Sequence, residues 1–227
     1  MSNNLRSRTI RLAHANPELR PHLLPLLTKV AAAVNVPGKH ILDNATVFGK
    51  AKVFGKAGVY DDAKVFGYAD VSGNANVMGN AKVYDDAKVS GSAEVSGKAE
   101  VYDNAKVYGT ANVGGNAHVS GGADVSGNAH VYDNVEVFGD AVVSGTVWVL
   151  GNAKVYGDAK VYEGAYVKDN ARVYGNAKVY GNARVLGTAE LSKRADISGT
   201  AEILGGKWDG SEGPITKGKW KAPGVPA

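Results

Sequence analysis

The chain contains no cysteine, so disulfide cross-links and thiolate metal sites are excluded. It also contains no run of about 18 apolar residues, and a transmembrane helix is therefore not expected. A basic stripe is missing as well, although the formal net charge is +4. Basic and acidic residues alternate along residues 41–202, and the excess of positive charge lies at the two ends. We therefore expect neither a membrane partner nor a nucleic-acid partner.

The most abundant feature of the chain is a six-residue repeat. From Ile41 to Ile203, every sixth residue is Val, Leu or Ile. The position four residues further on is Ala in 25 of 27 repeats, and the two exceptions are Val135 and Val147. The unit has the form A-x-V-x-G-N, and 27 units follow one another without an insertion or a deletion. A fixed short period of this kind is typical of a solenoid.

The unit divides into a short strand and a corner. In an extended A-x-V-x segment, alternate side chains point to opposite faces, so Ala and Val would face inward and the two variable residues would face water. The next position is Gly in 19 of the 27 units and Asp in six more. Gly adopts positive φ at no steric cost, and Asp tolerates it better than most residues. We therefore expect the chain to bend after every strand.

This pattern resembles the hexapeptide repeat of left-handed parallel β-helices, in which a small residue follows an aliphatic residue by four places. The resemblance covers residues 41–202, which are most of the chain. One difference is that Gly falls one place later than it does in the enzymes of that family. The resemblance implies a left-handed coil of triangular section, in which three hexads close one turn. We thus predict an all-β solenoid, a single-stranded left-handed parallel β-helix of about nine triangular coils, over residues 41–204.

With three hexads in a turn, residues at the same place in every third hexad would stack on the outer walls. One wall would then carry a nearly continuous aromatic ladder, which either stabilises the sheet or binds a glycan. Another wall gathers large apolar side chains near its C-terminal end, and we expect this candidate interface to be covered by the C-terminal tail or by a second copy of the chain. Its members are Trp148, Leu150, Tyr166, Leu186 and Leu204. The resemblance favours a trimer as the homo-oligomer.

Catalytic and metal sites are not expected in the repeat. Enzymes with hexapeptide repeats include acyltransferases, which usually use a His base near an extruded loop, and carbonic anhydrases, which hold a metal with three His at a subunit interface. Here the repeat contains only His118 and His130, two hexads apart on different walls, and no loop interrupts the hexads. We predict no catalytic residue, no metal and no cofactor. A trimeric transferase or anhydrase remains as an alternative function.

Residues 1–40 do not follow the repeat and carry six basic residues against one acidic residue. Asn16 and Pro17 indicate the start of a short helix. Three roles remain open for this segment, namely capping the first coil, docking onto a protein partner, and targeting. A secretory signal is disfavoured because Pro25 and Lys29 interrupt the apolar stretch. The candidate docking residues are Leu19, Leu23, Leu24 and Leu27.

The remaining predictions about function come from the two end segments of the chain. Residues 205–227 contain two GKW elements, and we predict that Trp208 and Trp220 cap the last coil. The N-terminal segment RTIRLAHANPELRPHLLPLL resembles those of uncharacterised virion-associated proteins of phages and bacteria. We therefore expect a non-catalytic structural or scaffolding protein, in the cytoplasm or in a virion such as a phage particle. A carbohydrate-binding module that uses the stacked aromatic residues is a further alternative.

Overall fold

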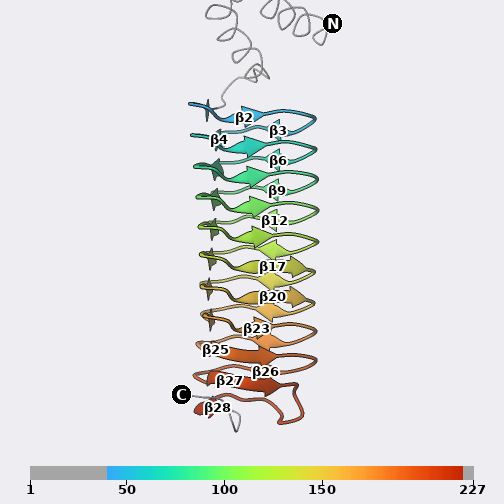
Figure 1. Ribbon diagram of the computed structural model, residues 1–227, viewed down its shortest axis with the longest axis vertical. Helices are drawn as coiled ribbons and strands as arrows, with labels where there is room; N and C mark the ends of the chain where they lie inside the picture. The colour runs from blue at the N-terminus through green and yellow to red at the C-terminus, as the bar shows by residue number, and fades with distance from the viewer. Residues whose placement is uncertain (1–39, 222–227) are drawn as a thin grey trace, which may run out of the picture.

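The computed structural model describes residues 40–221, which form an all-β parallel solenoid of about ten turns. Figure 1 shows the turns stacked along one long axis. At roughly 4.8 Å for each turn, this body is roughly 45 Å long. Each strand pairs in parallel with the strand one turn later, so that Val65 lies beside Val83 and Val83 beside Val101. The predicted turn of three hexads is therefore confirmed, whereas the left-handed sense of the coil stays a prediction.

Three stacks of strands form three walls. The first wall contains β2 (Thr46–Val47), β5 (Lys64–Val65), β8 (Lys82–Val83), β11 (Glu100–Val101), β14 (His118–Val119), β17 (Glu136–Gly139), β20 (Lys154–Gly157) and β23 (Arg172–Val173). The second wall contains β3 (Lys52–Val53), β6 (Asp70–Val71), β9 (Lys88–Val89), β12 (Lys106–Val107), β15 (Asp124–Val125), β18 (Val142–Val143), β21 (Lys160–Val161), β24 (Lys178–Val179) and β26 (Asp196–Ile197).

The third wall begins where the described chain begins. It contains β1 (His40–Ile41), β4 (Gly58–Val59), β7 (Asn76–Val77), β10 (Glu94–Val95), β13 (Asn112–Val113), β16 (His130–Val131), β19 (Trp148–Val149), β22 (Tyr166–Val167) and β28 (Lys219–Lys221). Two long strands, β25 (Arg184–Leu191) and β27 (Glu202–Trp208), run around the corner from the third wall to the first. These strands join the two walls into one sheet.

The core consists of the Ala and Val side chains that the repeat predicts to face inward. From Ala57 to Ile203, every one of these side chains is at most 1% exposed. The outward side chains lie between them along the same strands, for example Lys88 before the buried Val89. The turns are held to one another by backbone hydrogen bonds, such as that from Lys52 N–H to the Ala69 carbonyl at 2.8 Å. The alternation predicted for the A-x-V-x segment is thus confirmed.

The corners use the left-handed backbone conformation throughout. The first corner residue has positive φ in all 27 hexads, with 19 glycines and eight other residues. Where an acidic residue replaces Gly, its carboxylate can accept a hydrogen bond from the corner N–H of the next turn. Asp61 accepts such a bond from Gly79 at 2.8 Å, and Asp133 from Gly151 at 2.9 Å. The added hydrogen bond offsets the strain of the left-handed conformation at a residue with a Cβ.

The C-terminal tail continues the coil for about one more turn, beyond the boundary at residue 204 that the repeat suggests. Trp208 pairs with Leu191 on the first wall, and Trp220 pairs with Ile203 on the third wall. Between them, Ile215 forms a bridge with Ile197 on the second wall. The tail lacks the hexad pattern, and it nevertheless satisfies the backbone groups of the last regular turn, which would otherwise be an open sheet edge.

Candidate functional site

The candidate interface lies on the outer face of the third wall. Its five members belong to β19, β22, β25 and β27 or directly follow these strands. Trp148 is 43% exposed and stacks on His130 at 4.1 Å between ring centroids. The guanidinium group of Arg184 lies over the ring of Tyr166 at 5.6 Å. Leu150, Leu186 and Leu204 are half-buried.

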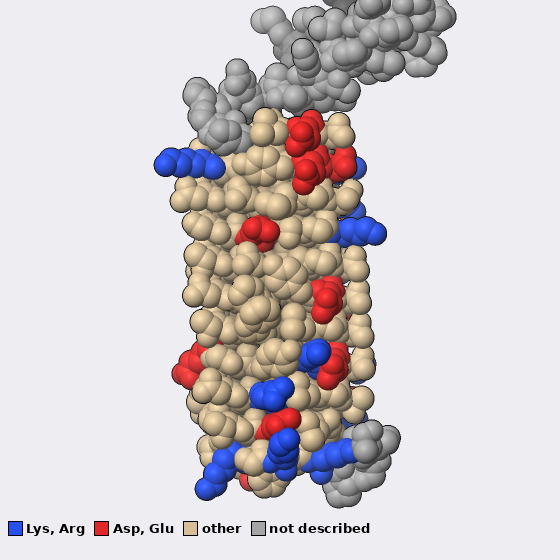
Figure 2. All heavy atoms as spheres, turned by 90° about the vertical axis from the view of Figure 1, so that its left-hand side faces the viewer, with Lys and Arg blue, Asp and Glu red and all other residues tan. Residues whose placement is uncertain are grey.

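The same wall has few charges from Leu42 to Leu150, whereas Lys168, Arg184 and Glu202 add charges beyond it. Among the outward residues that flank its buried aliphatic positions from Leu42 to Leu150, Glu94 alone is charged at neutral pH. Figure 2 views the side on which β4 lies in Figure 1, and most of that surface carries no charged side chain. The tail does not cover this face up to Lys221, because β28 forms the next rung of the wall at its end. What covers the patch stays a prediction.

The two tryptophans predicted to cap the coil lie next to each other at its C-terminal end. Trp208 is 8% exposed and belongs to the hydrophobic core, and its indole N–H donates to the Gly205 carbonyl at 3.1 Å. Trp220 is 42% exposed and meets Trp208 edge-to-face at 6.0 Å. The candidate docking leucines of residues 1–39 lie outside the described residues.

The aromatic ladder of the first wall has two segments. Phe48, Phe66, Tyr84 and Tyr102 stack with centroid distances of 4.9, 4.9 and 5.0 Å and with nearly parallel planes. Phe138, Tyr156 and Tyr174 continue in the same way at 4.8 and 4.9 Å. Inside each segment, both faces of a ring are covered by its neighbours. Only the rings at the ends of a segment therefore have a free face.

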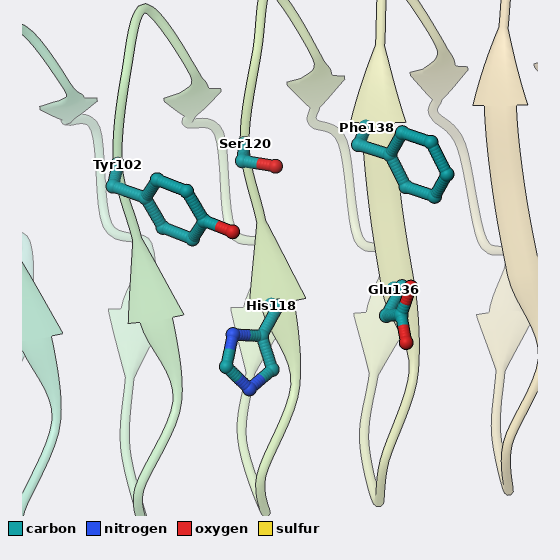
Figure 3. A pocket seen from close by; sticks show the side chains of 5 residues that line it. All are labelled: Tyr102, His118, Ser120, Glu136 and Phe138. Carbon is teal, nitrogen blue, oxygen red and sulfur yellow. The ribbon is translucent and has the colours of Figure 1, made fainter.

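The two segments are separated by one missing rung, at Ser120. A cavity of about 280 Å³ lies there, lined by Tyr102, His118, Ser120, Glu136 and Phe138. Figure 3 shows Tyr102 and Phe138 on either side of Ser120. His118 and Glu136 lie two residues before Ser120 and Phe138, on the same two turns. Ser120 is buried, whereas His118 is exposed and meets Tyr102 edge-on at 6.5 Å. We call this cavity the ladder gap.

Next to the ladder gap, the charged residues that precede the inward Val residues of the first wall form ion pairs. The Lys82 ammonium donates to Glu100 at 2.7 Å and the Tyr84 hydroxyl donates to the same carboxylate at 3.0 Å. Chiefly through the bond from Lys82, the pKa of Glu100 is held below its usual value, while burial raises the pKa of Tyr84. On the far side of His118, Glu136 accepts from Lys154 at 2.8 Å. His118 thus lies between two carboxylates that each already have a lysine partner.

Three groups of the kinds that occur in nucleophilic catalysis line the ladder gap. Ser120, His118 and Glu136 come together there, but the structure shows no hydrogen bond between their side chains over residues 40–221. A serine nucleophile is activated by a histidine base within hydrogen-bond reach of its hydroxyl. His118 and His130 lie on the first and third walls, as the sequence predicts, and within the described residues no group of His and acidic side chains is placed to hold a metal ion.

Ser120 was not singled out by the sequence, although the signal was present. It is the one position at which a serine interrupts the aromatic series of the first wall with a ring on each side.

In the described part of the chain, no helix is long and apolar enough to cross a membrane. The chain matches no protein-family model and no curated protein.

Proposed function

We propose that this protein is a non-catalytic structural protein, a rigid spacer or scaffold within a larger assembly such as a virus particle. The observation that supports this proposal best is the unbroken core, in which every inward side chain from Ala45 to Ile203 is buried and no extruded loop forms a cleft. A body of this kind maintains a fixed distance between its two ends. The left-handed sense of the coil and its place among hexapeptide-repeat proteins are parts of the same proposal and depend on the sequence pattern.

The proposal places the contact with the assembly in residues 1–40, the basic segment with the candidate docking leucines. The test is capture of binding partners on immobilised full-length protein and on a chain that begins at His40. We expect a partner that the full-length chain retains and the shortened chain loses. Equal capture by both would contradict docking through this segment. Aggregation of the shortened chain would instead favour a capping role.

The third wall is proposed as the surface through which copies of the chain associate. It is poor in charge from Leu42 to Leu150, where Trp148 presents an exposed indole beside Leu150. Replacing both residues with Ser removes apolar area that an interface would bury. In sedimentation experiments we expect the native chain to form an oligomer and the double variant to be monomeric. A native chain that is monomeric at all concentrations, or a variant of unchanged mass, would contradict this proposal.

The alternative functions have less support in the geometry. A sugar ring stacks on the face of an aromatic ring, and inside each segment of the ladder both faces of a ring are already covered, which leaves only the rings at the segment ends for such a contact. An enzyme of the transferase or anhydrase type would need a histidine in a cleft between subunits, and His118 and His130 are on different walls. Zinc binding by the oligomer together with loss of binding in His130→Ala, which lies on the proposed association surface, would revive that alternative.

A further inference from the structure

We propose that the ladder gap binds a small planar aromatic compound that carries a hydrogen-bond donor, and that its ring replaces the missing rung between Tyr102 and Phe138. This inference goes beyond the structural role, because it assigns a ligand site to a surface that a spacer does not require. It depends on three features of the gap, namely its spacing, its two free ring faces and its polar side.

The spacing of the gap fits one ring. Val101, Val119 and Val137 are aligned in successive turns, so a single turn lies between the rungs of Tyr102 and Phe138. In the intact parts of the ladder, each turn holds one ring at 4.8 to 5.0 Å from the next. A planar ring above Ser120 would lie at the same distance from both neighbours. A puckered saturated ring has no π-face and would touch its neighbours only through its axial C–H groups.

The gap also leaves two aromatic faces without a partner. Tyr102 ends one segment of the ladder and Phe138 begins the other, so each lacks a stacked neighbour on the side of the Ser120 rung, and Figure 3 shows Ser120 between the two residues. Offset stacking between aromatic rings is favourable beyond the burial of apolar area. A bound aromatic ring would make two such contacts at once. The second wall has no equivalent site, because two serines, Ser126 and Ser144, separate Tyr108 from Tyr162.

The polar side chains that line the gap determine which substituent the bound ring should carry. The carboxylate of Glu136 accepts from Lys154 through Oε1, and no bond to its second oxygen is found among the described residues. His118 and the hydroxyl of Ser120 line the same cavity. These groups favour a ring with an N–H or O–H group at its edge, as in phenols and indoles. Residues 1–39 and 222–227 contain no Tyr or Trp, so these segments supply no phenol or indole.

The experiment uses the full-length protein and three probes, p-cresol, toluene and methylcyclohexane. Saturation-transfer NMR measures their binding, and amide chemical shifts locate it. We expect p-cresol to bind more tightly than toluene, methylcyclohexane not to bind, and the shifts to concentrate at Tyr102, His118, Ser120 and Phe138. Binding of methylcyclohexane as strong as that of p-cresol, or shifts elsewhere on the surface, would overturn the proposal.

The matched variants are Ser120→Tyr, which completes the ladder, and Ser192→Tyr, which adds the same ring beside Tyr174 at the end of the ladder and creates no new gap. We expect Ser120→Tyr to weaken p-cresol binding by at least about tenfold, because the protein's own ring fills the gap. It should also raise the melting temperature, which would show that the variant is folded. Ser192→Tyr should bind p-cresol as the native chain does. Unchanged binding in Ser120→Tyr, or equal loss in both variants, would refute the site.

Discussion

Replacing Val143 with Asp is expected to destabilise the protein by about 4 kcal/mol or more, because it puts a carboxylate into the sealed core. Val143 is 0% exposed and lies in β18, between Val125 and Val161 of the adjacent turns. Its neighbours inside the coil are Ala and Val side chains, which offer no partner for a charge. The measurement is the free energy of unfolding from urea titration, followed by circular dichroism.

The control is the same substitution one residue earlier. Val142 points outward from β18, and it lies beside Asp124 on one side and Lys160 on the other. An Asp at this position meets one like and one opposite charge and remains in water. We expect Val142→Asp to change the free energy of unfolding by less than about 1 kcal/mol. Similar losses in the two variants would contradict the inward orientation of the Val series.

The second large effect is expected at a corner, where Gly91→Ala should cost about 2–3 kcal/mol of stability. Gly91 has a φ of 71°, and a Cβ at this position would lie 2.7 Å from the Gly109 carbonyl oxygen. The variant thus combines an unfavourable backbone conformation with a close contact to the next turn. Thermal and urea unfolding of the variant and the native chain measure the cost.

Three further variants separate these causes. Gly213 has positive φ, but a Cβ added there would have nothing within 4 Å, so Gly213→Ala should cost only about 1 kcal/mol. Gly122 has an ordinary φ, and its Cβ would meet mainly the flexible end of the Asp140 side chain, so Gly122→Ala should be nearly neutral. Gly91→Asp should be milder than Gly91→Ala, because an Asp at a corner accepts the N–H of the next turn. A larger loss of stability in Gly91→Asp than in Gly91→Ala would contradict this explanation of the corners.

Most of the fold was predictable because its information is local and repeated. The inward Ala and Val series and the corner residues occur 27 times, so each prediction about one hexad applies to all of them. The turn of three hexads came from the resemblance to hexapeptide repeats, and it fixed which outward residues stack. The aromatic ladder followed from that register, and the structure confirms the stacking from Phe48 to Tyr102.

The parts that could not be predicted are those without a repeat. In the tail, Trp208 pairs with Leu191 and Trp220 with Ile203, and each interval is one position shorter than a regular turn, so the register of the hexads misses both pairings. Ile215 keeps the regular interval from its partner Ile197. The ladder gap could not be predicted for a different reason. Its residues were visible in the sequence, but a cavity arises only from the ring positions on each side of Ser120.

The central claim is that stacked turns with a sealed core make a rod whose length is proportional to the number of turns. Duplicating residues 51–104, which form three full turns, should lengthen the particle by about 14 Å and leave its cross-section unchanged. Small-angle X-ray scattering of the native and extended chains measures both quantities. An extended chain with a thicker cross-section, or with an unchanged maximum dimension, would contradict the account.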